Sequence, residues 1–309
     1  MTTTVQSTSR IMMVRPKNFG FNPHTAESNA YQQVLSELSS DDVQQKALTE
    51  FDVFVNILRE AGVTVTVIED LEHPVTPDAL FPNNWISFHI QGKIILYPIM
   101  APNRRNEIRM DIPDYFIQEN SSIQLIDFSP LAEEGKFLEG TGSMIMDRVN
   151  NIAYASHSDR TDEEVFDLFC QQVGYEGIFF HAVDANGHPI YHTNVMMALG
   201  SSFVVICEES ILDPEEKATL RASFKRTGHE VVSISQEQVS QFAGNMLEVR
   251  NDRGEIHIVM SKRAFDSLDD SQIQTLEKHG KLLVIPIDII EVYGGGSVRC
   301  MMAEVILPN

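Results

Sequence analysis

The chain has 309 residues, of which 43% are hydrophobic, enough to bury a sizeable core. It carries 23 Lys and Arg against 44 Asp and Glu, and this formal net charge of -21 argues against nucleic acid or an anionic membrane as a partner. Its three cysteines lie far apart without CxxC or Cys/His spacing, which argues against a disulfide framework and a structural zinc site. The N-terminus has no apolar leader and no run of about eighteen apolar residues occurs, so we expect a cytoplasmic protein.

One pattern recurs along the chain, consisting of a helical run with a polar face, a turn residue and a β-rich apolar run. The predicted helices are 47–61, 113–119, 162–173, 214–227 and 270–279. The strands predicted after them are 63–68, 123–126, 177–183, 231–234 and 282–287. The turn residues lie about 54 residues apart, at Gly62, Asn120, Gly174, Gly228 and Gly280. Since Gly or Asn after a helix favours the left-handed conformation, these residues support the predicted helix ends.

Further strand-like runs lie between these units, at 85–90, 93–97, 195–199 and 203–206. One helix and about three strands per unit, repeated five times, predict a closed α/β ring. Such a ring gathers the ends of its inner strands at a central cavity, where residues distant in sequence meet. The alternative is a generic α/β chain in which the regular spacing is accidental.

The C-terminal tail places Cys300 shortly after the glycine triplet at 294–296. Glycines allow another molecule to approach closely, so Cys300 is a candidate nucleophile. Such a cysteine needs a base and a group that orients the base or the substrate, and His192 and Glu139 are candidates because each lies at the edge of an element. The ordinary alternatives are a buried inert thiol, a solvated histidine and a surface glutamate in a turn.

Together these motifs resemble those of the guanidino-group-modifying enzymes. Glu139-Gly140, His192-Thr193-Asn194 and the glycine-rich run before Cys300 stand in the order of that superfamily's Glu-Gly, His-x-Asp and Gly-rich Cys motifs. The superfamily includes amidinotransferases, arginine deiminases and dimethylarginine hydrolases. The stretch 81–85 and the region 15–30 resemble its citrulline-utilisation hydrolase branch, so the likeness spans nearly the whole chain.

The resemblance implies a pentein, a five-bladed ββαβ propeller with pseudo-fivefold symmetry around a central active-site cavity. We expect one catalytic domain over residues 1–309, with a flexible N-terminal segment at 1–9. The resemblance also implies a hydrolase that needs no metal or other cofactor. Cys300 would attack the central carbon of a guanidino or ureido group, His192 would pair with the thiolate, protonate the leaving amine and activate water, and Glu139 would orient His192 or bind the substrate.

Two positions depart from the arginine-processing pattern, because Asn84 and Asn194 stand where arginine deiminases carry Asp. Aspartate only accepts hydrogen bonds and suits a guanidinium, whereas an amide both donates and accepts. A neutral ureido group suits two amides better. We therefore hypothesise citrulline as the substrate, cleaved to ornithine, CO₂ and ammonia through an S-carbamoyl intermediate. Asp78 would restore one negative charge and would favour arginine.

An amino-acid substrate also needs its α-carboxylate bound, and Arg104 and Arg105 are candidates because Arg binds carboxylates bidentately. Arg299 adjoins Cys300 but would point to the opposite face of a strand, so it is left out of the site. The rival activities are arginine deiminase, dimethylarginine hydrolase and amidinotransferase. A non-catalytic pentein that binds a partner is a further alternative, against which the Cys, His and Glu set argues. The expected partner is a small amino acid, and a homo-oligomer is left open.

Overall fold

The computed structural model describes residues 5–26, 28–29, 31–34 and 38–308. Within these residues the strands form five three-stranded sheets of one plan, in which the middle strand pairs antiparallel with the inner strand and parallel with the outer strand. The inner strands lie beside one another around the centre of the ring. The predicted α/β five-bladed propeller is therefore confirmed.

The sheets follow the chain, except that the C-terminal strand completes the first of them. The strands are β1 (Arg10–Arg15), β2 (Thr64–Glu69) and β15 (Ala303–Glu304) in the first sheet, β3 (Ile86–His89), β4 (Lys93–Leu96) and β5 (Gln124–Asp127) in the second, β6 (Met144–Asp147), β7 (Ile152–Ser156) and β8 (Glu176–Phe180) in the third, β9 (Met197–Leu199), β10 (Phe203–Ile206) and β11 (Glu230–Ser233) in the fourth, and β12 (Leu247–Arg250), β13 (Ile256–Ser261) and β14 (Lys281–Ile285) in the fifth.

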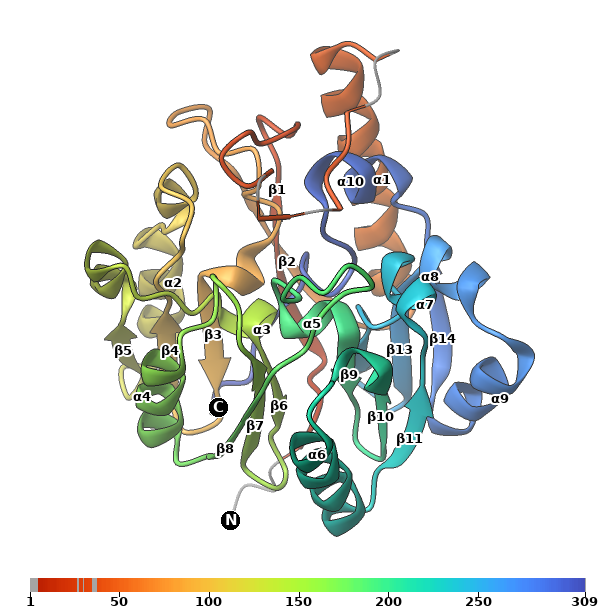
Figure 1. Ribbon diagram of the computed structural model, residues 1–309. Coiled ribbons are helices and arrows are strands. Elements are labelled where there is room, and N and C mark those ends of the chain that lie inside the picture. Colours follow the sequence, from red (N-terminus) through yellow and green to blue (C-terminus); the bar gives the residue numbers. More distant parts are fainter. Residues whose placement is uncertain (1–4, 27, 30, 35–37, 309) are drawn as a thin grey trace.

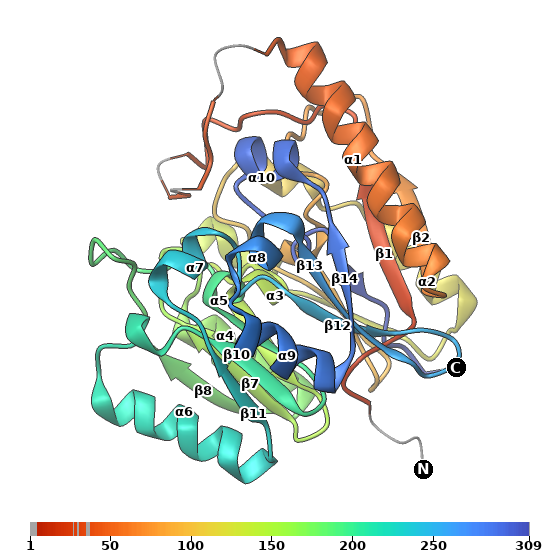
Figure 2. The same ribbon diagram turned by 90° about the vertical axis from the view of Figure 1, so that its right-hand side faces the viewer.

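One long helix in each unit lies outside its sheet (Figure 1). These helices are α1 (Ser40–Glu60), α2 (Asp111–Glu119), α4 (Glu163–Val173), α6 (Pro214–Thr227) and α9 (Asp270–His279). Shorter helices are α7 (Gln236–Ser240), α8 (Lys262–Ser267), α10 (Asp288–Gly294), η2 (Arg104–Glu107), η3 (Ser129–Glu134) and η4 (Glu208–Ser210). Figure 2 shows α1 running along β1 and β2. Among the described residues, no helix combines the length and apolar character of a membrane span.

Four of the five long helices begin where the sequence supplies a side-chain acceptor, and α2, which follows Met110, is the exception. Asp162, Asp213 and Asp269 cap α4, α6 and α9 by accepting hydrogen bonds from backbone N–H groups of the first turn. Helix α1 begins seven residues before the predicted start, because Ser39 and Asp42 form a capping box there.

The predicted left-handed turn residues are confirmed at three positions and wrong at two. Gly62, Gly174 and Gly228 have φ of 87°, 74° and 76°. Asn120 has φ of −149°, and Gly280 has φ of −179°, so both are extended. Gly280 is instead required by packing, since a Cβ there would lie 2.9 Å from Cγ2 of Ile256.

A short helical turn precedes each inner strand, on the side of the ring that faces away from the chain termini (Figure 1). These turns are η1 (Pro82–Asn84) before β3, α3 (Gly140–Ser143) before β6, α5 (Thr193–Met196) before β9, residues 242–245 before β12 and residues 297–301 before β15. The strand predicted at 195–199 is therefore wrong at its start, where α5 replaces it. The five turns carry the residues of the candidate site.

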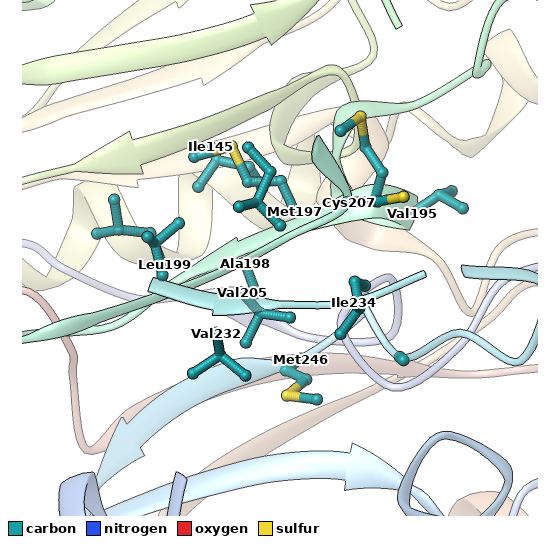
Figure 3. Close-up of a cluster of buried hydrophobic side chains, with 14 of the residues drawn as sticks. Ile145, Val195, Met197, Ala198, Leu199, Val205, Cys207, Val232, Ile234 and Met246 are labelled. Carbon is teal, nitrogen blue, oxygen red and sulfur yellow. The ribbon is translucent and has the colours of Figure 1, made fainter. Parts of the chain in front are cut away.

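Apolar side chains from neighbouring blades fill the space between the sheets. Figure 3 shows one such cluster, in which Ile145 of β6 lies beside Met197 of β9, while Val205 comes from the middle strand and Val232 from the outer strand of the fourth sheet. Between the first two blades, Met12, Trp85 and Ala303 belong to another cluster. Neighbouring blades thus share hydrophobic cores, and the single catalytic domain expected over residues 1–309 stays a prediction.

The segment predicted as flexible, residues 1–9, is packed where the structure describes it. Residues 1–4 lie outside the described residues. Gln6 and Ser7 are buried, Gln6 Nε2 donates to the carbonyl of Met146 at 2.8 Å, and Ser7 Oγ donates to Glu248 at 2.8 Å. Residues 6 and 7 therefore differ from the expectation, because their polar side chains find partners on the third and fifth blades.

We predict that Gly280→Ala destabilises the protein by about 1–3 kcal/mol through close packing against Ile256. An unstrained Gly→Ala change would instead stabilise by about 0.4–1 kcal/mol. Urea unfolding measures the difference, and the double variant with Ile256→Ala should lose less than the sum of the two single losses. A Gly280→Ala variant as stable as the wild type would contradict this account of the glycine.

Candidate active site

A small cavity lies where the five turns meet, and five of the predicted site residues line it: Asp78, Asn84, Arg104, His192 and Cys300. Glu139 and Asn194 lie directly behind the lining, in contact with His192 and Cys300 respectively. Thr25 and Asn29, from the loop after β1, close one side of the cavity. The enclosed space is only about 20 Å³, room for about one water molecule, so an amino acid needs the site to open.

Cys300 lies in the last turn before β15 and is only 4% exposed. Two side-chain amides donate toward its sulfur, from Asn194 Nδ2 and from Asn245 Nδ2, each 3.5 Å from Sγ. The sequence analysis did not identify Asn245. It follows Gly244 in the Ala-Gly-Asn-Met run at 243–246, a glycine-polar pair before an apolar strand like that at Glu139-Gly140.

The glycine triplet serves a different purpose from the one expected. Cβ atoms at Gly294 and Gly296 would lie 2.8 Å and 3.0 Å from the ring of Phe81, and one at Gly295 would lie 2.6 Å from Asn29. Gly295 also has φ of 61°. The triplet therefore lets the loop before Cys300 pass beneath Phe81 and Asn29, so that the loop closes the cavity.

His192 and Glu139 form the pair predicted for them. His192 Nε2 lies 2.8 Å from Glu139 Oε2, and both side chains are buried. Burial would raise the pKa of Glu139, but Arg160, His192 and Arg104 outweigh it and lower that pKa. Burial lowers the pKa of His192 to about 4, although the bond to Glu139 opposes the shift. Since an ionised Glu139 only accepts, neutral His192 donates from Nε2 and leaves Nδ1 as a proton acceptor.

Arg160 is a second residue that the sequence analysis missed, and it lies two residues before the helix predicted at 162–173. Its side chain is 2% exposed and lines the cavity beneath the ring of Tyr191. Nη1 lies 3.4 Å from Glu139 Oε2, and Nη2 donates to Ser28 Oγ at 2.6 Å. Its Nε is buried without a partner among the described residues. A donor of this kind in a cavity wall can bind an anionic part of a ligand.

Arg104 lies in the cavity wall, but carboxylates already occupy its guanidinium. Nε and Nη2 each donate to Glu107 at 2.9 Å, and Nε lies 3.5 Å from Asp78. Burial would lower the pKa of Arg104, but Glu107, Asp78 and Glu139 outweigh it and keep the residue charged. Nη1 donates to Oδ1 of Asn84 at 3.0 Å. Arg104 therefore orients Asn84 and has little capacity left for a substrate carboxylate.

The structure does not bring Arg105 into the site. Its guanidinium donates to the carbonyls of Ile99, Met100 and Ala132 and to Glu133. It lies outside the cavity lining. Arg104 and Arg105 are consecutive in a 3₁₀ helix, where neighbouring side chains point in different directions.

Besides Arg160 Nε, three further buried polar atoms at the cavity lack a partner among the described residues: Asn84 Nδ2, Asn194 Oδ1 and Asp78 Oδ1. Asn84 and His192 meet over Gly142, where a Cβ would lie 2.5 Å from Asn84 Nδ2 and 2.8 Å from His192 Nδ1. Buried polar groups normally have partners, so these atoms mark where a ligand would bind. They offer one donor and two acceptors.

Metal ligation was not expected from the sequence. Among the described residues, no group of three or more His, Cys, Asp and Glu is arranged to hold a metal ion. The expectation of a reaction without metal or cofactor stays a prediction.

Comparison with solved structures identifies the same fold elsewhere. The N-terminal domain of ArgZ bound to substrate, described as an arginine dihydrolase from cyanobacteria, matches with a TM-score of 0.73 at 16% identity over 97% of this chain and 98% of that one. AgrE in complex with ornithine and NAD⁺ matches with a TM-score of 0.73 at 18% identity over 98% of this chain and 40% of that one. A dimethylarginine dimethylaminohydrolase adduct with S-methyl-L-thiocitrulline matches with a TM-score of 0.63 at 15% identity over 96% and 98%.

No curated protein matches the sequence. A family model does match it, over residues 15–307, and that model describes the eukaryotic N,N dimethylarginine dimethylhydrolases. The match covers four blades in full, the first blade except most of β1, and every residue of the candidate site. The chain thus belongs to the dimethylarginine dimethylhydrolase family of the guanidino-group-modifying pentein superfamily, a superfamily of cysteine-dependent hydrolases and their relatives.

Proposed function

We propose that the protein hydrolyses the ureido group of citrulline, giving ornithine, CO₂ and ammonia. The observation that carries the proposal is the set of unpartnered atoms at the cavity, with a donor on Asn84 and acceptors on Asn194 and Asp78. A ureido group offers one carbonyl oxygen and N–H donors, which complements that set. A guanidinium offers donors only, so it would leave Asn84 Nδ2 facing another donor.

The orientation of the Asn84 amide is the critical step, because the two ends of an amide are easily exchanged. Arg104 fixes it, since a guanidinium can only donate and its Nη1 lies 3.0 Å from Oδ1 of Asn84. Nδ2 must then face the cavity side, where His192 lies. This donor would bind the ureido oxygen and would stabilise the negative charge that develops on that oxygen during attack.

Arg160 is the residue that we assign to the α-carboxylate of the substrate, in place of Arg104 or Arg105. It lines the cavity with an unpartnered Nε, whereas Arg104 is held by Glu107. The loop residues Thr25 and Ser28 contact Arg160, so a carboxylate bound at this arginine would lie beside the part of the loop that closes the cavity. Water would be excluded from the reacting group as a result.

The reaction that we propose uses three side chains of the site, Cys300, His192 and Glu139. Neutral His192 takes the proton of the Cys300 thiol, and the thiolate attacks the ureido carbon. The bond from that carbon to the ornithine nitrogen breaks, and His192 donates the proton to the leaving amine, which gives an S-carbamoyl cysteine. Water, deprotonated by His192, attacks the carbamoyl carbon of this thiocarbamate and releases Cys300 and carbamate, which decomposes to CO₂ and ammonia. Glu139 stabilises the imidazolium that forms in each half.

Arginine dihydrolysis is the second candidate, and one contact favours it. Asp78 places a carboxylate at the cavity with Oδ1 unpartnered, and a carboxylate suits a guanidinium. Structural neighbours are described as arginine dihydrolases. Hydrolysis of arginine twice at one carbon would pass through a ureido group, so the two candidates share the second chemical step. They differ in whether arginine itself is consumed.

We predict that the purified protein releases ornithine and ammonia from citrulline, and that Cys300→Ala abolishes the release. Chromatography of the amino acids with citrulline or arginine as substrate measures this. Arg105→Gln, at a charged side chain outside the cavity, is the control and should keep wild-type activity. Consumption of arginine with ornithine as product would favour the second candidate, and no reaction with either amino acid would contradict both.

Exchanging the amide and carboxylate beside the reacting group should shift the preference between the two substrates. Asn84→Asp removes the donor to the ureido oxygen, so kcat/KM for citrulline should fall about 10- to 100-fold, the loss of one buried hydrogen bond to a developing charge. Asp78→Asn should impair arginine more than citrulline. Steady-state kinetics of both variants with both substrates measures the ratio, and equal effects on the two amino acids would contradict the proposed pairing.

A neutral His192 in the free enzyme has a consequence for stability at low pH. Its folded pKa of about 4 lies below the ordinary 6.5, so the unfolded chain binds the proton first as the pH falls. The contribution is complete above pH 6.5 and is lost as the pH falls toward 4, to a total of about 3 kcal/mol. Urea unfolding at pH 7 and pH 4 should show that the wild type loses this much more than His192→Asn, whose amide keeps a donor for Glu139. Parallel losses in the two proteins would mean that folding leaves the pKa of His192 at its ordinary value, and a smaller loss in the wild type would mean that His192 rests protonated.

A further inference from the structure

Four of the five blades place a recognised site residue on the turn before the inner strand. Asn84 lies two residues before β3, Asn194 three residues before β9 and Cys300 three residues before β15, while Glu139 begins the turn before β6. In the fifth blade the equivalent position belongs to Asn245, two residues before β12. The pseudo-fivefold arrangement therefore brings Asn245 to the same centre as the other four, and no role has yet been assigned to it.

Asn245 is 0% exposed and its amide has one possible orientation. The backbone N–H of Arg299 donates to Oδ1 at 2.9 Å, so Oδ1 is the acceptor end. Nδ2 then faces the carbonyl of Asn194 at 2.9 Å and Cys300 Sγ at 3.5 Å. Both contacts exclude the flipped amide. In that orientation Oδ1 would face the carbonyl oxygen of Asn194, and Nδ2 would face the backbone N–H group of Arg299.

The sulfur needs such a donor, because the resting histidine does not supply a positive charge. Burial lowers the pKa of His192 to about 4, so at neutral pH it is an uncharged base rather than an ion-pair partner of the thiolate. Arg160 and Arg104 are directed at Glu139 and Glu107. The amide N–H groups of Asn194 and Asn245 are then the donors that face Sγ, while Oδ1 of Asn245, 3.9 Å away, accepts from the neutral thiol. Hydrogen bonds donated to the charged form favour it.

We propose that Asn245 is a catalytic residue whose side-chain amide donates to Sγ of Cys300 and stabilises the thiolate in both halves of the reaction. Asn194 supplies the second donor, so the nucleophile lies between amides from the fourth blade and its neighbour. The proposal rests on Cys300 being the nucleophile of the proposed function and is independent of which amino acid the enzyme hydrolyses.

The test is the rate at which iodoacetamide alkylates Cys300 between pH 5 and pH 10, followed by mass spectrometry of the Cys300 peptide. Cys170 and Cys207 should react slowly, because burial raises the pKa of each thiol. Asn245→Asp keeps the acceptor for Arg299 and turns the donor toward Sγ into a carboxylate oxygen. We expect the alkylation midpoint to rise by about one pH unit and the rate at pH 7 to fall about tenfold.

Asn251→Asp is the matched control, since Asn251 is also a buried asparagine of the fifth blade, with side-chain bonds to Ala61 and Glu255 but none to Cys300. It should lose stability without moving the midpoint. If Asn245→Asp does not fold, Asn245→Ala replaces it, with a smaller rise of the midpoint expected. An unchanged midpoint in a folded Asn245 variant overturns the proposal and leaves Asn245 with a structural role alone.

These outcomes remain distinguishable from failure of the proposed function, because alkylation needs no substrate. A raised midpoint together with no turnover of citrulline or arginine would keep the role of Asn245 and reject the substrates. Turnover of either amino acid with an unchanged midpoint would support the substrate and reject the role of Asn245.

Discussion

A buried carboxylate organises the site. Glu139 is fully buried, and an isolated charge in such a place would be strongly unfavourable. Three cationic or donor groups compensate it: Arg104 at 3.8 Å, Arg160 at 3.4 Å and His192 at 2.8 Å. They come from the second, third and fourth blades, so the charge is satisfied only when these three blades are packed together. Removing one partner of such a group would leave an uncompensated charge in the interior.

The arrangement of the turns that carry the site also requires that the backbones of neighbouring turns lie close together. A Cβ at Gly140 would lie 2.3 Å from the carbonyl oxygen of Asn83, and one at Gly244 would lie 2.3 Å from that of Val195. In each case a glycine of one blade lies against the turn of the preceding blade. Because the glycines place no side chain between these backbones, the turns can approach closely. Five side chains of the site can therefore converge on about 20 Å³ of free space.

The parts of the structure that the sequence predicts are those marked by the repeat or by a local sequence signal. Helix caps such as Asp213 and apolar runs such as 203–206 are local, so the sequence predicts their elements closely. The Cys, His and Glu of the site were found because their motifs are short and contiguous. Arg160 and Asn245 were missed because what marks them is an unpartnered Nε and a contact to sulfur, neither of which has a sequence pattern. Arg105 was included wrongly, since one residue of difference in a 3₁₀ helix decides which arginine faces inward.

Two buried glutamates anchor the loop that carries Cys300, and their contribution to the stability of the fold falls as the pH rises to neutral. Glu50 of α1 accepts from the N–H groups of Ile289 and Ile290 at the start of α10, and Glu291 accepts from Ser297 Oγ at 2.6 Å, three residues before Cys300. Burial raises the pKa of Glu50 and that of Glu291 to about 7. Because both folded pKa values exceed the ordinary 4.5, the stability that each group contributes is complete below pH 4.5 and is lost as the pH rises through 7. Ionised carboxylates are nevertheless the stronger acceptors, so the loop that carries Cys300 is held most firmly under conditions in which its anchors stabilise the fold least.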